Sequence, residues 1–146
     1  MQILPCPGFE AAGVAAGIKK NGRKDLGLIV CEPPAAVAGL FTRNQVQAAP
    51  VRLDRERVQG GLCRAVIANS GNANCCTGPQ GMADAIAMSR LAASGLSISE
   101  ELVCVASTGV IGQALPVEKI ESALPGLVRP LSEEGFSDFA QAIMTT

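Results

Sequence analysis

Two short apolar runs in this sequence each lead directly into a loop of glycine and small polar residues, and a helical pattern follows each loop. The first run is RAVIA at 64–68, which precedes the loop NSGNANCCTG at 69–78. The second is LVCVA at 102–106, which precedes STGVIG at 107–112. Buried strands that alternate with helices favour an α+β fold whose elements stack as layers. With 146 residues, 48% of them hydrophobic, the chain is long enough to bury one core.

Further strands and helices are predicted around these two units. The run at 26–31 is predicted to be a buried strand and 36–42 its antiparallel neighbour, with Glu-Pro-Pro as the reversal between them. The segment 9–19 is expected to be extended or irregular, because its glycines disfavour a helix. Longer helices are predicted over 79–93 (closed by Gly95), 117–124 and 133–143, the last with Ser132 as its N-cap.

A short amphipathic helix is predicted after Pro50, and the glycines at 60 and 61 are expected to end it. Its charges alternate in sign, which is typical of a helix face in contact with water. Four residues are therefore expected on a solvated face: Asp54, Arg55, Glu56 and Arg57.

The composition excludes several classes of function. The chain contains no His, so neither a Ser-His-Asp nor a Cys-His catalytic site can be assembled within it. A net charge of −1 and the absence of interleaved basic and aromatic residues argue against a nucleic-acid partner. The six cysteines include no Cys-x-x-Cys pair, so no metal site is predicted, and buried reduced thiols are expected.

The same composition bears on where the protein works. The first ten residues have neither a basic start nor an apolar core, so no signal peptide is predicted. No stretch reaches the roughly 18 apolar residues that would span a membrane. A soluble, cytoplasmic protein without a membrane partner is expected.

The loop at 69–78 has two interpretations. Asn and Gly tolerate left-handed backbone and self-bonded turns, so the loop can be an ordered connection whose amides bond to its own backbone. Alternatively it is a polar loop at the carboxyl end of a strand, where α/β proteins often bind ligands. It matches neither of the glycine-rich nucleotide-binding patterns.

The loop at 107–112 also has two interpretations. Gly109 has no Cβ to block a ligand, and its N–H follows the Thr108 hydroxyl by one residue, so both groups can point at one developing anion. This is what an oxyanion hole requires. The alternative is an ordinary strand-to-helix turn.

The motifs of both loops resemble those of the ornithine acetyltransferase family, also called bifunctional arginine biosynthesis proteins or glutamate N-acetyltransferases. The resemblance rests on ANSGNAN at 68–74 followed by Thr77-Gly78 and Gly81, and on STGVIG followed by Leu115-Pro116. It extends, in the family's order, to GFEAAGVAAGIKKNGRKDLGLIV, AVAGLFTRNQVQAAPV and the closing AIMTT. It implies a layered α/β/β/α sandwich of which residues 1–146 form a single N-terminal portion, incomplete without the C-terminal β chain.

The resemblance also implies an activity. The family's precursor cleaves itself before a Thr, and this Thr becomes the nucleophile at the start of a β chain, with its own amine as the base. An acetyl group passes from N2-acetyl-L-ornithine to the Thr and then to L-glutamate, and some members also use acetyl-CoA. No cofactor is implied, and the expected assembly is an α2β2 heterotetramer. Family α chains continue past the Thr-Thr at 145–146, so the nucleophile is expected outside this chain, which alone should be inactive.

Residue roles carried over from the family fall on three places. Thr108 and Gly109 match the oxyanion-stabilising pair. Thr145 and Thr146 match the substrate-contacting Thr region, with Thr145 favoured. The loop residues Asn69, Asn72 and Asn74 match a family hallmark and are given a role in shaping the site. Cys75 departs from the pattern, because many relatives carry a small apolar residue there.

Two other functions are kept open. One is a related self-cleaving amidohydrolase or aminopeptidase, which would use the same oxyanion stabilisation but release the product to water. The other is a non-catalytic module that binds a small ligand and folds alone.

Overall fold

The computed structural model of the chain describes residues 6–145. Part of the N-terminal segment on which the signal-peptide prediction rests, and Thr146, lie outside this range. The strands are β1 (Phe9–Val14), β2 (Leu26–Ala36), β3 (Leu62–Asn72) and β4 (Val103–Val110). The helices are α1 (Ala49–Arg57), α2 (Gly78–Leu96), α3 (Val117–Val128) and α4 (Phe136–Ile143), with 3₁₀ turns at Val58–Gly60 and Glu100–Leu102.

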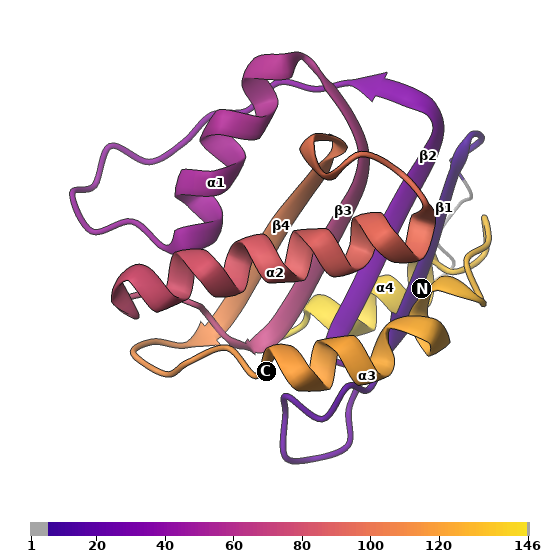
Figure 1. Cartoon of the computed structure of the whole chain (residues 1–146). Coiled ribbons are helices and arrows are strands. Elements are labelled where there is room, and N and C mark those ends of the chain that lie inside the picture. Colours follow the sequence, from indigo (N-terminus) through magenta and orange to yellow (C-terminus); the bar gives the residue numbers. More distant parts are fainter. Residues whose placement is uncertain (1–5, 146) are drawn as a thin grey trace.

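The four strands form one mixed sheet in the order β1-β2-β3-β4. β1 and β3 both pair antiparallel with β2, whereas β4 pairs parallel with β3. Because side chains alternate between the faces of a strand, one face collects the buried apolar residues of all four strands, such as Leu28, Ile67 and Val105. Helices α2 and α3 lie across this face and α4 lies behind the sheet (Figure 1). The α+β class is thus confirmed, and this chain supplies one sheet and its helical layer.

The opposite face of the sheet is covered only in part. Helix α4 packs there against β1 and β2, where Gly13 pairs with Gly27. A Cβ on Gly27 would lie 2.7 Å from Cδ2 of Phe139, so the missing side chains allow the helix to approach closely. Farther along this face, Ile29 and Val66 are only half-buried and line a shallow apolar cavity of about 190 Å³. This face therefore has apolar surface left over for another partner.

The predicted hairpin between 26–31 and 36–42 is wrong. β2 runs through Glu-Pro-Pro to Ala36, and its neighbours are β1 and β3 rather than 36–42. The pairing with β3 is interrupted between Val30 and Ala35 and then resumes, so the prolines, which cannot donate a backbone hydrogen bond, fall in the irregular part.

Segment 38–48 is an irregular loop fixed by the side chain of Arg55. The guanidinium donates hydrogen bonds to the Thr42 carbonyl (3.0 Å) and Gln47 Oε1 (3.2 Å), and it lies 5.6 Å from the ring centroid of Phe41.

Several element ends also differ from the prediction. α2 passes through Gly95, which packs against Leu124 of α3, and ends at Ser97 in the left-handed conformation. α4 begins at Phe136, so Ser132 is not its N-cap. Instead the backbone of Ser132 exchanges two hydrogen bonds with that of Ala11, so the chain forms an isolated antiparallel bridge beside β1 before it turns into α4.

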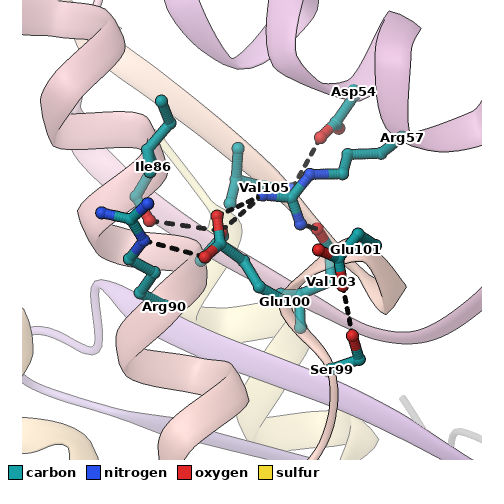
Figure 2. Close-up of polar contacts among 10 residues, drawn as sticks. Asp54, Arg57, Ile86, Arg90, Ser99, Glu100, Glu101, Val103 and Val105 are labelled. Carbon is teal, nitrogen blue, oxygen red and sulfur yellow. Dashed lines mark hydrogen bonds and ion pairs between the residues drawn. The ribbon is translucent and has the colours of Figure 1, made fainter.

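The predicted solvated face of α1 is wrong for its two most important charges. Asp54 Oδ1 accepts a hydrogen bond of 2.9 Å from the Val105 N–H of β4, and burial raises the pKa of its carboxyl to about 6. The side chain of Arg57 is only 10% exposed and donates to Glu100, to the Val103 carbonyl and to Ser89. Figure 2 shows these groups converging between α1, α2 and β4. The charges of α1 thus anchor the helix to the edge strand, because β4 leaves backbone groups for them to bond.

Candidate active site

The two polar segments predicted as loops each begin as strand, and these strand parts lie side by side. β3 continues to Asn72 and β4 to Val110, with Ser70 opposite Thr108 and Gly71 opposite Gly109. The parallel pairing therefore brings the two motifs together at the carboxyl end of both strands. This is the edge of the sheet at which α/β proteins commonly bind ligands.

The backbone at Gly109 requires glycine for two reasons. Its φ is +137°, a conformation that residues with a side chain rarely adopt. A Cβ there would also collide with Gly71 and lie 2.6 Å from the Asn72 nitrogen. The close approach of the two strands thus depends on Gly109, while Thr108 beside it is exposed.

Thr108 lies on the less covered face of the sheet. It follows the buried Val105 by three residues, so strand alternation directs it away from the α2–α3 layer. Its partner Ser70 is fully buried, and the Ser70 hydroxyl donates a hydrogen bond to the Ala142 carbonyl near the end of α4. The exposed Thr145 lies two residues beyond the end of this helix. The segment that precedes Thr145 therefore contacts β3, the strand that pairs with the strand of Thr108. Thr146 lies outside the described residues.

The side chains of Asn69 and Asn72 bond within the protein. Asn69 Nδ2 donates to the Asn72 carbonyl (2.9 Å), and Asn69 Oδ1 accepts from the Ser107 hydroxyl (2.6 Å). Asn72 Nδ2 donates to the carbonyls of Gln113 and Ala114 at 3.1 and 3.0 Å. These bonds tie the end of β3 to β4 and to the segment that follows it.

Asn74 plays the same part at the start of α2. Its Nδ2 donates to the Gly81 carbonyl (2.8 Å), and its Oδ1 accepts from the Thr77 hydroxyl (3.0 Å). Its own N–H donates to Asn72 Oδ1 at 2.7 Å. All three asparagines are at most 4% exposed, which favours the interpretation of an ordered connection over that of amides facing a ligand.

Sequence reasoning missed a buried carboxylate that supports this region. Asp25 is fully buried and accepts hydrogen bonds from the N–H groups of Ala16 (2.6 Å) and Lys19 (2.7 Å). The Lys19 ammonium donates to the Met144 carbonyl, and the Lys19 stem packs against Gly71. Asp25 thus orders the turn from which Lys19 holds the Met144 carbonyl near Gly71. The signal in the sequence is an acidic residue directly before an apolar strand, next to a basic turn.

A separate cavity of about 590 Å³ lies between the first turns of α1 and α2. It is lined by Gln45, Val46, Gln47, Ala49, Arg52, Asn74, Cys76, Thr77, Gly78, Pro79 and Met82. Thr108 and Gly109 are not among these residues. The cavity is nevertheless linked to them, because the Cys75 carbonyl behind it accepts a hydrogen bond from the Gly112 N–H (2.8 Å).

Within residues 6–145, no group of three or more His, Cys, Asp and Glu side chains is arranged to hold a metal ion. Of the cysteines, Cys31, Cys63 and Cys104 are buried and free as predicted, whereas Cys6 and Cys76 are exposed and Cys75 is partly so. None of the helices in this part of the chain is both long and apolar enough to traverse a lipid bilayer.

Comparison with known proteins identifies the family. The ArgJ family matches residues 10–146. Two proteins named "Arginine biosynthesis bifunctional protein ArgJ" are similar to nearly the whole chain. The one from Syntrophotalea carbinolica is 52% identical over 139 residues, and the one from Symbiobacterium thermophilum is 53% identical over 141 residues. In both cases 95% of this chain is covered but only 35% of the relative, so the chain spans about a third of their length.

Solved structures agree with the sequence comparison. The ornithine acetyltransferase of Mycobacterium tuberculosis, solved in complex with ornithine, superimposes with a TM-score of 0.93 at 47% identity, over 97% of this chain and 77% of that one. The arginine biosynthesis bifunctional protein ArgJ of Bacillus halodurans superimposes with a TM-score of 0.88 at 43% identity, over 96% of this chain and 73% of that one. The resemblance inferred from the motifs is therefore confirmed, and the chain belongs to the ArgJ family.

Proposed function

We propose that this chain is the N-terminal, α-chain portion of an acetyltransferase that moves an acetyl group from N2-acetyl-L-ornithine to L-glutamate. Thr108 and Gly109 supply the oxyanion hole, and Thr145 supplies part of the substrate pocket. The nucleophile is the N-terminal Thr of a β chain from the same precursor, and the enzyme works in the cytoplasm as an α2β2 assembly. The proposal is supported by family membership and by the names of the relatives.

The observation that carries the proposal is the Ser70–Ala142 hydrogen bond together with the pairing of Ser70 with Thr108. It supports the proposal because Thr108 and the end of α4, beyond which Thr145 lies, are on the same face of the sheet, and part of that face is uncovered. When a hydroxyl attacks an acetyl carbonyl, the oxygen becomes negative, and preorganised donors lower the energy of that state. The β chain is expected to cover the remaining apolar surface near Ile29 and Val66 and to bring its Thr to Thr108.

The most direct test replaces Thr108 in the complete αβ enzyme. Loss of one oxyanion donor lowers kcat by about 10²–10³-fold, so Thr108→Ala should lower kcat far more than it raises KM. Thr108→Ser keeps the hydroxyl and should retain most of the activity. Thr42→Ala, in the exposed loop before α1, is the control and should behave like the unchanged enzyme. Normal turnover by Thr108→Ala would remove this hydroxyl from the mechanism.

Gly109→Pro is a second test, but a less specific one. It removes the amide donor and should abolish turnover. However, proline fixes φ near about −65°, and the strand has +137° at this position. Part of its effect would therefore come from distortion of the strand.

Hydrolysis is separated from transfer by the second substrate. The complete enzyme is incubated with N2-acetylornithine, with and without glutamate. Formation of acetylglutamate supports transfer, whereas ornithine release that is independent of glutamate supports the amidohydrolase alternative. Supplying acetyl-CoA in place of acetylornithine tests whether it also serves as a donor.

A further inference from the structure

Two thiols lie next to each other on the surface of the loop between β3 and α2. The Sγ atoms of Cys75 and Cys76 are 3.8 Å apart, and either can donate a hydrogen bond to the other. Cys76 is exposed and Cys75 partly exposed, so both are accessible to a reagent in solution.

The backbone that carries this pair is held firmly. The Cys75 carbonyl accepts a hydrogen bond from the Gly112 N–H at 2.8 Å, and the Ala73 N–H donates to the Val110 carbonyl at 2.9 Å. Asn74, directly before the pair, is fully buried with its side chain bonded on both ends. A ligand that bridges the two sulfurs would therefore lose little entropy in ordering them.

The geometry suits a bridging atom better than a disulfide. Adjacent Cα atoms are about 3.8 Å apart across a trans peptide, whereas a disulfide usually needs about 4.4 Å or more. A trivalent arsenic atom is pyramidal, with an S–As–S angle close to a right angle, so two bonds of about 2.3 Å, the length of a typical metal–thiolate bond, place the sulfurs about 3.3–3.4 Å apart. The observed separation between the Cys75 and Cys76 sulfurs is 3.8 Å, so the sulfurs need to approach by only a few tenths of an ångström to hold such an atom, against well over 1 Å for a disulfide.

We propose that Cys75 and Cys76 form a dithiol site for trivalent arsenicals that carry one organic group. Two sulfurs complete the coordination of such an arsenic atom, so no third protein ligand is needed. With phenylarsine oxide, two S–H bonds break and two As–S bonds form, and the arsenic-bound oxygen leaves as water without any change in oxidation state. Burial and the neighbouring Cys76 thiol raise the pKa of Cys75, so this thiol keeps its proton until it reacts with the arsenic.

An arsenical bound at the dithiol site would affect both the cavity between α1 and α2 and the segment that follows Gly109. Cys76 lines the cavity of about 590 Å³, and Cys75 bonds to the segment that follows Gly109. If the proposed transferase function is correct, the bound arsenical should also inhibit acetyl transfer. The binding measurement itself does not depend on that function.

The test uses the full-length protein that contains this chain, under reducing conditions, treated with phenylarsine oxide and measured by intact-mass spectrometry. Cys75→Ala and Cys76→Ala each remove one sulfur from the site. Cys6→Ala removes an exposed thiol outside it and is the matched control. A dithiol such as 2,3-dimercaptopropanol should release the adduct, whereas an excess of a monothiol should not.

The expected result is one phenylarsenic adduct in the unchanged protein and in Cys6→Ala, and loss of that adduct in both loop variants. Absence of an adduct in the unchanged protein would overturn the proposal. So would an adduct that persists in Cys75→Ala and Cys76→Ala, because the arsenical would then be held elsewhere in the protein.

Discussion

Arg57 and Arg90 form ion pairs of equal length with the same carboxylate, yet their removal should have very different effects. Each places a guanidinium nitrogen 2.8 Å from an oxygen of Glu100. The side chain of Arg57 is 10% exposed, whereas that of Arg90 is 69% exposed. Arg57 also donates to the Val103 carbonyl and to Ser89 Oγ, each at 3.1 Å, as Figure 2 shows for the carbonyl.

The magnitude follows from what each substitution leaves behind. Arg57→Met keeps an apolar stem but removes a donor from the Val103 carbonyl, which costs about 1–3 kcal/mol for a buried polar group. Glu100 is 28% exposed and keeps Arg90, so its charge is not left unpaired, and the total falls below the 3–5 kcal/mol typical of breaking a fully buried pair. We expect a loss of about 2 kcal/mol. Arg90→Met removes an exposed pair, which contributes about 1 kcal/mol or less.

The assay is amide hydrogen exchange of β4 in the complete protein, because the bonds of Arg57 close one end of that strand. A loss of about 2 kcal/mol corresponds to roughly 30-fold faster exchange by local opening, whereas Arg90→Met should change the rate only a few-fold. Equal effects of the two substitutions would refute the reasoning, since they would show that burial does not decide the strength of these pairs.

Three further predictions concern the pH dependence, the site and the sheet. Burial raises the pKa of Asp54 to about 6 from 3.8, so between these pH values the folded state binds more protons than the unfolded state. The free energy of unfolding should therefore fall as pH rises from about 4 to about 6. In urea denaturation at a series of pH values, Asp54→Asn should remove most of this fall. Ser70→Ala removes the hydrogen bond to α4 and so loosens the segment that carries Thr145; it should raise the KM for acetylornithine more than it lowers kcat. Ser122→Ala, on α3, is the control and should change neither constant. The isolated 146-residue chain should self-associate in size-exclusion chromatography with light scattering, and a monodisperse, cooperatively folding monomer would favour the ligand-binding alternative.

The sequence was a good guide to where strands begin and a poor one to where they end. The apolar runs at 26–31 and 64–68 lie in strands, and the run at 102–106 lies in a strand from Val103 onward. β3 and β4 nevertheless continue through Asn and Gly residues, which have low strand propensity, because each strand supplies the other with hydrogen-bond partners. Such support from a neighbouring strand is invisible in a local pattern.

The contacts that assemble the candidate site were equally invisible. Burial of Arg57 depends on Glu100, which lies 43 positions away in the sequence. The contact of the end of α4 with β3, the strand that pairs with that of Thr108, depends on α4 crossing the back of the sheet, which no spacing predicts. Thr108 and Gly109 were accessible from residue chemistry, whereas Thr145 came only from the resemblance. The roles of Lys19 and Asp25 were not predicted, because these side chains act by bonding to backbone groups of other segments.

Gly13 and Gly27, the paired glycines under α4, determine how closely that helix approaches the sheet. They therefore also determine the position of the segment that follows the helix. A methyl group on Gly27 would lie 2.7 Å from Phe139 and 3.4 Å from Ala142. Gly27→Ala would therefore push α4 away from the sheet, and the residues that follow the helix would move with it. The position of the segment that carries Thr145, which we propose to line the substrate pocket, is thus set from a glycine within the sheet. A substitution at Gly27 is therefore expected to change the fit of the substrate although Gly27 is not one of the proposed pocket residues.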